Sequence, residues 1–211
     1  MDLKELSLSI QKGDANKAKE LVKLCIEKNI NAELILNEGL ISAMDEIGVK
    51  FKNNDIYVPE VLIAARAMNA AMQILEPVLI EAGVKNIGKA VIGTVKGDLH
   101  DIGKNLVGMM LKGKGIEVYD LGVDVSAKEF ADKSEEVGAQ IVCLSALLTT
   151  TMPAMKDIID EFNRREIRDK YVLMVGGAPI TNNYANQIGA DCYAEDAATA
   201  AEVAKSFLLE G

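Results

Sequence analysis

The first 85 residues carry apolar side chains at the spacing of amphipathic helices and show no strand-like alternation. In the clearest of these segments one face holds Ala18, Leu21, Val22, Cys25 and Ile26. Gly13 and Asp14 separate this helix from a shorter one before it. Asn31 suits the N-cap of a third helix, and Pro59 suits the first position of a fourth. The short connections between these helices predict an antiparallel bundle.

The pattern changes after Pro77 and Gly83, which are expected to loosen the chain before a linker at residues 85–88. From there short apolar runs alternate with helical segments. The expected strands cover residues 89–95, 116–121, 141–144, 171–175 and 191–193, and the expected helices cover residues 103–112, 126 onward, 155–165, 182–188 and 197–209. This alternation predicts a doubly wound, five-stranded parallel sheet of the flavodoxin-like or Rossmann-like kind. We therefore expect an α/β protein with a helical domain at residues 1–85 and an α/β domain at residues 86–211.

Charge and cysteine content argue against several classes of function. The net charge of −9 argues against binding to a nucleic-acid backbone, which needs clustered Lys and Arg. Cys25, Cys143 and Cys192 form no C-x-x-C pair, so neither a zinc knuckle nor a disulfide framework is supported. The N-terminus lacks a signal-peptide pattern, and the longest apolar run is too short to span a bilayer. We expect a cytoplasmic protein with reduced thiols and neither nucleic acid nor membrane as partner.

The candidate chemistry lies around His100, the only histidine of the chain. It follows the first expected strand, between Asp98 and Asp101, with Gly103 expected to allow close packing. In a flavodoxin-like sheet the first and third strands are neighbours, and ligands bind where their carboxyl ends meet. The loop after the third strand carries Ser145 to Thr151, and Gly176-Gly177 ends the fourth. His100 is therefore a candidate metal ligand with a carboxylate behind it.

Other interpretations of the same loop fit the residues less well. Residues 97–104 resemble a phosphate loop, but the glycine spacing is one residue too long and Asn105 replaces the magnesium-binding Ser or Thr. A dinucleotide site would need the motif G-x-G-x-x-G after the first strand, which this chain lacks. A phosphoacceptor domain would need an aspartate in place of Ser145, and a zinc enzyme would need further nitrogen or sulfur ligands. Asp98 and Asp101 also suit helix N-caps, Ser145 and Thr149 suit backbone hydrogen bonds, and His100 suits an ordinary loop position.

Three elements together resemble a known family. Asp98-x-His100-x-x-Gly103 is followed after 41 residues by Ser145-x-Leu147, and after a further 28 residues by Gly176-Gly177. This is similar to the cobalamin-binding signature of the cobalamin-dependent methyltransferases and mutases. In the first half, Met44-x-x-x-Gly48-x-x-Phe51 and Tyr57-Val58-Pro59-Glu60 resemble the helical cap of methionine synthase and of the small corrinoid proteins of anaerobic methyl transfer.

The resemblance implies a bound cobalamin, as methylcobalamin or another corrinoid, whose own base has left cobalt. His100 would bind cobalt from below, Asp98 would accept a hydrogen bond from the other ring nitrogen, and Thr151 would extend this relay. Asp101 would lie beside the cofactor. The nucleotide slot would be lined by Gly103, Gly176 and Gly177, and the buried base contacted by Ser145, Leu147 and Thr149. The upper corrin face would be covered by Tyr57, Ala64, Ala67 and Met68.

The resemblance further implies a methyl carrier, the corrinoid subunit of a methyltransferase system rather than a complete enzyme. Its expected partners are a substrate-specific methyltransferase, a second methyltransferase with tetrahydrofolate or a thiol as acceptor, and a corrinoid reductive activase. The expected alternatives are a cobalamin-binding sensor and the cobalamin subunit of a mutase. The methyl donor and the final acceptor are left open by the sequence.

Overall fold

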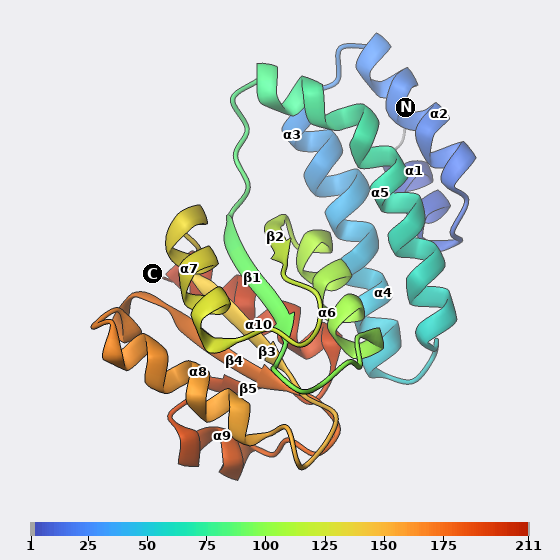
Figure 1. The fold of residues 1–211 in the computed structure, drawn as a ribbon. Coiled ribbons are helices and arrows are strands. Elements are labelled where there is room, and N and C mark those ends of the chain that lie inside the picture. The colour runs from blue at the N-terminus through green and yellow to red at the C-terminus, as the bar shows by residue number, and fades with distance from the viewer. Residues whose placement is uncertain (1–2, 211) are drawn as a thin grey trace. The chain divides into compact units, whose positions relative to one another are not determined.

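The computed structural model describes residues 3–210, which fall into two compact units (Figure 1). The first unit extends to Asn86 and includes residues 113–115. The second unit covers residues 87–112 and continues from Ile116. Within residues 3–210 no helix is long and apolar enough to cross a membrane.

The first unit is helical, as the apolar spacing predicts. Its elements are α1 (Leu3–Gln11), α2 (Ala15–Glu27), α3 (Ala32–Leu34), the π-helical η1 (Ile35–Ile41), α4 (Ser42–Lys52) and α5 (Val58–Glu81). Asp14 caps α2 by accepting a hydrogen bond from the Lys17 backbone at 2.9 Å. Asn31 caps α3 in the same way through the Leu34 backbone at 3.1 Å. The Asn31 N-cap agrees with the sequence prediction, and Asp14, expected only to separate two helices, is also an N-cap.

Two features of this unit differ from the sequence prediction. The third expected helix contains the π-helical segment η1, in which Gly39 lies so close to Leu6 of α1 that a Cβ atom would come within 2.6 Å of the leucine side chain. Pro77 does not end the fourth helix but lies inside α5. An internal proline costs a helix about 3 kcal/mol. Burial of Leu75 and Leu79 on either side of it, at about 1.5–3 kcal/mol each, offsets that cost.

The second unit is built on a five-stranded parallel sheet with the predicted strand order, β2-β1-β3-β4-β5. The strands are β1 (Gly88–Thr94), β2 (Ile116–Asp120), β3 (Ile141–Ser145), β4 (Val172–Gly176) and β5 (Cys192–Tyr193). The helices are α6 (Ile102–Gly113), α7 (Ala127–Val137), α8 (Pro153–Arg164), the 3-10 turn η2 (Arg168–Lys170), α9 (Asn182–Ile188) and α10 (Ala197–Glu210). The α/β fold class is thereby confirmed.

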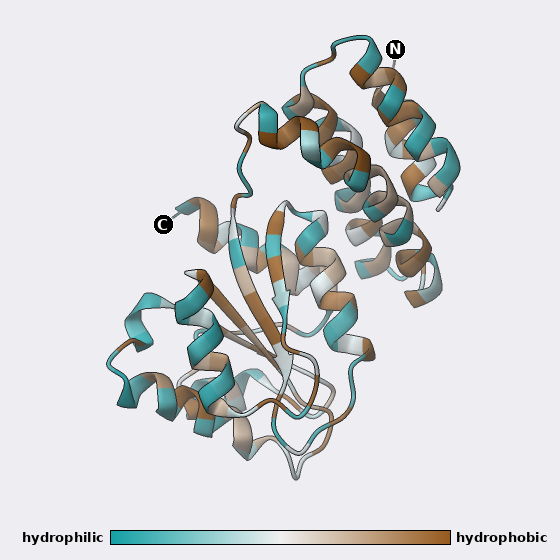
Figure 2. Ribbon diagram, turned by 45° about the horizontal axis from the view of Figure 1, so that its top comes forward, coloured by the Kyte–Doolittle hydropathy of each residue, from teal (hydrophilic) through white to brown (hydrophobic). Residues whose placement is uncertain are grey.

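One face of the sheet carries a continuous core. Val91, Val142 and Leu173 from three neighbouring strands pack with Phe130 of α7 and Phe162 of α8, all of them buried. Figure 2 shows hydrophobic colour along these strands, whereas the helices combine hydrophobic and hydrophilic residues. The strands can be almost wholly apolar because helices cover a doubly wound sheet on both faces.

The register of the sheet brings three strand ends together. Thr94 of β1 pairs with Ser145 of β3, which in turn pairs with Gly176 of β4. The loops that leave β1 and β3 therefore begin side by side at the carboxyl edge of the sheet. This edge is where the sequence predicts the functional residues.

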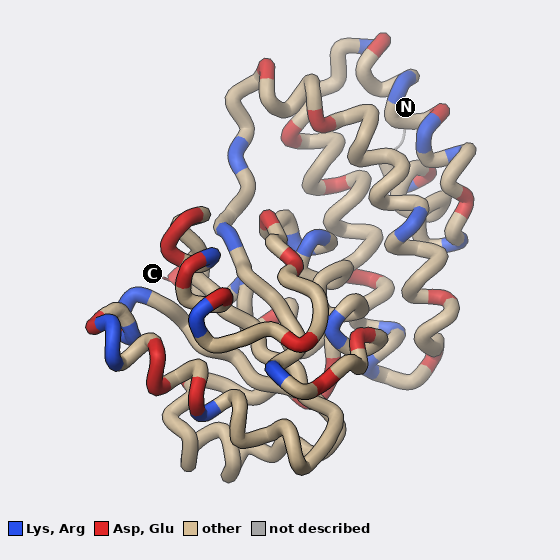
Figure 3. The backbone as a smooth tube through the Cα atoms, in the orientation of Figure 1, with Lys and Arg blue, Asp and Glu red and all other residues tan. Residues whose placement is uncertain are grey.

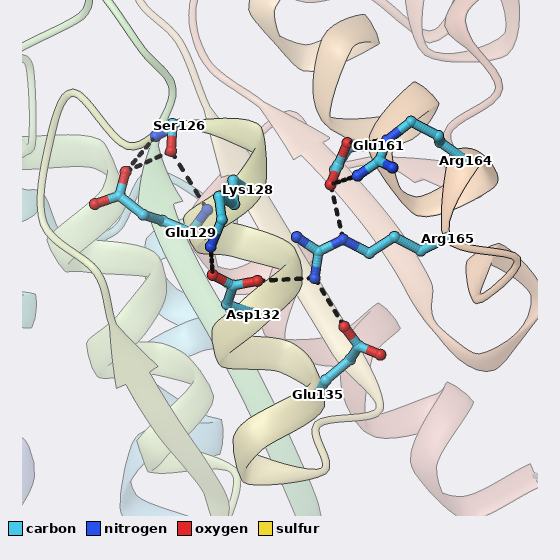
Figure 4. A network of polar contacts seen from close by, with 8 residues as sticks. All are labelled: Ser126, Lys128, Glu129, Asp132, Glu135, Glu161, Arg164 and Arg165. Atoms are coloured by element: carbon cyan, nitrogen blue, oxygen red, sulfur yellow. Dashed lines mark hydrogen bonds and ion pairs between the residues drawn. The ribbon is translucent and has the colours of Figure 1, made fainter.

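Helices α7 and α8 are joined by an ion-pair network around Arg165, the residue that follows α8 (Figure 4). Its Nη1 lies 2.8 Å from a carboxylate oxygen of Asp132 and 2.8 Å from one of Glu135, both on α7, and its Nε donates to Glu161 at 2.7 Å. Hydrogen bonds from Arg164 and Arg165 lower the pKa of Glu161 to about 2. Both helices carry acidic as well as basic residues (Figure 3).

A capping box formed by Ser126 and Glu129 stands at the start of α7. The Glu129 backbone donates to the Ser126 hydroxyl at 3.3 Å, and the Ser126 backbone donates to the Glu129 carboxylate at 2.9 Å. These reciprocal bonds satisfy two backbone donors that the first turn of a helix leaves unpaired.

We predict that Arg165→Ala lowers the melting temperature by several degrees, because Arg165 joins two helices and its side chain is only 18% exposed. Arg164→Ala is the matched control, because Arg164 is 70% exposed and pairs with Glu161 of its own helix. Thermal denaturation followed by circular dichroism at low and high salt measures both variants. The Arg165 effect should shrink at high salt, and equal effects of the two substitutions would contradict the prediction.

Candidate functional site

The site is organised around His100 and the carboxylate of Asp98. Asp98 has no exposed surface, whereas the His100 ring is half exposed. The Asp98 Oδ1 atom lies 2.7 Å from His100 Nδ1 and also accepts the His100 backbone N–H at 3.1 Å. An ionised carboxylate only accepts hydrogen bonds, so Nδ1 must carry the hydrogen. The other ring nitrogen, Nε2, then presents a lone pair and has no hydrogen-bond partner within residues 3–210.

The second oxygen of Asp98 is held by the loop that follows β3. Thr151 Oγ1 and the Leu147 backbone N–H each donate to Oδ2 at 2.8 Å, and the Leu148 N–H approaches it at 3.3 Å. Burial raises the pKa of Asp98, but the hydrogen bonds from Leu147, His100 and Thr151 outweigh it and hold that pKa well below its usual range. Asp98 therefore stays ionised and orients the imidazole. The structure thus brings Asp98, His100 and Thr151 together, as the sequence predicts.

Further contacts hold the main chain of this loop. Thr94 Oγ1 donates to the His100 carbonyl at 2.8 Å. The Asp124 carboxylate accepts the Gly97 N–H at 2.7 Å, and the Asp124 N–H donates to the Asp98 carbonyl at 3.0 Å. Neither Thr94 nor Asp124 is among the residues predicted from the sequence. The available signal is weak, since each is a polar residue at the carboxyl end of a strand or in the loop that follows it.

The predicted glycines have different environments. A Cβ atom on Gly177 would lie 1.9 Å from the Ala146 carbonyl oxygen, and its φ of +131° also requires glycine. A Cβ on Gly176 would come within 3.2 Å of the Ala194 carbonyl oxygen. Gly103 is different, because no atom lies within 4 Å of where its Cβ would be. Close packing is therefore the wrong explanation for Gly103, which borders open space at the start of α6.

The other predicted residues lie as follows. Asp101 directly precedes α6, and its carboxylate accepts a hydrogen bond from the Asn105 side chain at 3.0 Å. Ser145 is half-buried at the end of β3, and Leu147 and Thr149 are exposed in the loop after it. In the helical unit, Tyr57 is 65% exposed at the N-cap of α5. Buried positions along the same helix are held by Ala64, Ala67 and Met68.

Exposed apolar side chains lie in the same two loops as His100 and the donors that hold Asp98. Leu99 and Ile102 are 71% and 76% exposed, and Leu147 and Leu148 are each 42% exposed. Large apolar side chains at such exposure, close in sequence to an imidazole nitrogen without a partner, are typical of a binding site. These residues suit a mainly apolar ligand that offers a metal ion to Nε2.

A phosphate-binding role for this loop does not fit the structure. Lys104, which would have to reach a phosphate, is only 3% exposed. Its Nζ pairs with the Asp120 carboxylate at 2.6 Å, and Asp120 also accepts the Gly122 N–H at 2.8 Å. Lys104 therefore holds α6 to the end of β2.

Comparison with known proteins identifies the family. Residues 88–204 match the model of a B12 binding domain, and residues 2–76 match a second B12 binding domain. The chain belongs to the B12-binding proteins. A corrinoid protein of Desulfitobacterium hafniense is 39% identical over 98% of this chain and 97% of its own length. Dimethylamine corrinoid protein 1 of Methanosarcina mazei is 42% identical over 99% of this chain and 95% of its own.

Solved structures agree with this assignment. The methanol:cobalamin methyltransferase complex MtaBC from Methanosarcina barkeri contains a chain that matches with a TM-score of 0.88 at 26% identity, over 99% of this chain and 80% of that one. The expected relation to corrinoid proteins of methyltransferase systems is thereby confirmed, as is the expectation of a corrinoid cofactor. The unpaired Nε2 atom, the apolar surroundings and the open space at Gly103 all fit such a cofactor.

The ionised state of Asp98 predicts an acid-dependent stability. A carboxyl group whose pKa is lower in the folded than in the unfolded chain stabilises the fold above its unfolded pKa of about 4. That contribution is lost as the pH falls from there towards the folded pKa. Asp98→Asn should lower the unfolding free energy of the apoprotein by about 2 kcal/mol at neutral pH, because the amide cannot accept all of these hydrogen bonds.

Urea denaturation followed by circular dichroism at several pH values measures this effect. The difference between wild type and Asp98→Asn should narrow as the pH falls below about 4. Asp101→Asn, at an exposed carboxylate three residues further on, is the control and should show a small difference at every pH. If the difference in unfolding free energy between wild type and Asp98→Asn were the same at all pH values, the assignment of Asp98 as an ionised acceptor would be contradicted.

Proposed function

We propose that this protein is a methyl carrier that binds cobalamin with His100, in place of the cofactor's own base, as the lower ligand of cobalt. It would accept a methyl group from a substrate-specific methyltransferase and deliver it to a second methyltransferase with tetrahydrofolate or a thiol as acceptor. The observation that carries the proposal is the Asp98–His100 contact of 2.7 Å at Nδ1, which leaves Nε2 available to a metal.

The site residues have distinct tasks in this proposal. The bound corrinoid supplies a cobalt ion that can accept and release a methyl group. His100 would hold the metal through Nε2, while Asp98 would fix the tautomer and strengthen the ligand. The negative charge of the buried Asp98 carboxylate, 2.7 Å from Nδ1, would keep the hydrogen on that nitrogen. Thr151 keeps Asp98 in place through its 2.8 Å hydrogen bond.

We assign the remaining predicted residues on the same basis. Gly103, Gly176 and Gly177 would border the nucleotide tail, and Ser145, Leu147 and Thr149 the displaced base, with Asp101 beside them. Residues 1–85 would act as the cap over the upper corrin face through Tyr57, Ala67 and Met68. Residues 86–211 would form the cobalamin-binding domain, and residues 85–88 the hinge between the two.

The relatives support the partner assignment. Similar chains are named dimethylamine corrinoid proteins, and a similar chain is part of a methanol:cobalamin methyltransferase complex. We propose a substrate-specific methyltransferase as the first partner and a second methyltransferase as the acceptor. A corrinoid reductive activase would be the third partner, because occasional oxidation of cobalt interrupts methyl transfer.

Methyl transfer by the reconstituted protein tests this function. The protein is loaded with a corrinoid, reduced, and mixed with the methyltransferase of a methylamine or methanol system and its isotopically labelled donor. We expect labelled methyl to appear on the protein-bound corrinoid and then on an added thiol in the presence of a second methyltransferase. His100→Ala should bind corrinoid but transfer methyl at least about tenfold more slowly, and added imidazole should restore part of the rate. Stable corrinoid binding without methyl uptake from any donor would favour a sensor instead.

A further inference from the structure

The Thr94 hydroxyl makes a hydrogen bond to the His100 main chain that the pairing of β1 in the sheet does not require. Thr94 is the last residue of β1 and has no exposed surface. Its backbone is already paired, with N–H donating to Gly122 at 2.9 Å and the carbonyl accepting from Val125 at 3.0 Å. Its hydroxyl donates to the His100 carbonyl at 2.8 Å. Valine has the same shape and the same preference for strands, so packing alone does not require a threonine here. The hydroxyl therefore has a separate role.

This hydroxyl completes the restraint of His100. Asp98 holds the His100 backbone N–H at 3.1 Å and the ring at 2.7 Å, but it does not contact the carbonyl on the other side of the Cα atom. The carbonyl is held by Thr94, two residues before α6 begins at Ile102. With both peptide groups and Nδ1 bonded, the donor Thr94 and the acceptor Asp98 together determine the direction of Nε2.

The effect of Thr94 is confined to His100 because other contacts anchor the rest of the loop. Asp124 accepts from the Gly97 N–H at 2.7 Å and donates to the Asp98 carbonyl at 3.0 Å. Neither bond involves Thr94. Removing the Thr94 hydroxyl would therefore leave the loop in place but release the peptide group that follows the His100 Cα atom.

We propose that Thr94 is a positioning residue that holds His100 in the orientation needed for cobalt ligation. The inference rests on the proposed role of His100 as the lower ligand. Asp98 and Thr151 restrain the His100 ring. Thr94, at the end of β1, would add a restraint on the His100 main chain.

The first test is the Co(II)/Co(I) midpoint potential of the protein loaded with cobalamin. Thr94→Val leaves a buried carbonyl without its donor and should weaken axial ligation about tenfold. Since Co(I) keeps no axial nitrogen, this loss destabilises only the Co(II) state and should raise the potential by about 59 mV. Thr94→Ser keeps the hydroxyl and should match wild type. Ser134→Ala, which removes a buried hydroxyl-to-carbonyl hydrogen bond of 2.7 Å within α7, is the matched control and should not move the potential.

The second test needs no corrinoid. Because His100 is the only histidine, isotopically labelled histidine gives signals from one imidazole ring only in the apoprotein. Hydrogen exchange at Nδ1 should be about tenfold faster in Thr94→Val and unchanged in Thr94→Ser. Thr94→Ala replaces the valine variant if that one does not fold.

An unchanged potential and exchange rate in Thr94→Val, or a serine variant that shifts as far as the valine variant, would overturn the proposal. The exchange measurement also separates this proposal from the one on which it rests. If wild-type holoprotein showed no histidine on cobalt, the ligand assignment would fail, whereas the apoprotein would still report whether Thr94 orients the ring.

Discussion

The Asp98 carboxylate is the interaction on which the site depends. It is fully buried, and burying an unpaired charge costs several kcal/mol, so it requires strong partners. Those partners come from both sides of a sheet crevice: the His100 ring and backbone after β1, and Leu147 and Thr151 after β3. One side chain thereby fixes the imidazole and joins two loops that are far apart in sequence.

The strand order explains why these loops meet. In the order β2-β1-β3-β4-β5 the chain reverses direction across the sheet between β1 and β3. Their ends are in register at Thr94 and Ser145. A histidine placed in the loop after β1 is therefore within reach of main-chain donors after β3, without any long side chain having to bridge the gap. The Asp98 contact at Nδ1 then leaves Nε2 without a hydrogen-bond partner among residues 3–210.

Much of this could be predicted from the sequence, for identifiable reasons. The Asp98–His100 pair lies two residues apart, so its geometry is local, and the parallel α/β sheet follows from alternating strands and helices. Thr151 lies 53 residues from Asp98, and only the family resemblance identified it. The Leu147 N–H and Thr94 hydroxyl contacts cannot be predicted from the sequence, because backbone donors have no side-chain signature and threonine is common in strands. Pro77 does not end α5, because tertiary burial of the helix outweighs a local helix-breaking tendency.

The central claim is that a protein nitrogen, and not the cofactor's own base, ligates cobalt. Electron paramagnetic resonance of the cob(II)alamin-loaded protein tests it directly, because the axial nitrogen splits the cobalt signal. With a single histidine in the chain, ¹⁵N-histidine labelling marks only the His100 ring. If His100 is the ligand, the nitrogen splitting changes from a triplet to a doublet in the labelled protein. A splitting that stays a triplet would show that the cofactor's own base is still bound to cobalt, and would contradict the proposed roles of His100 and Asp98.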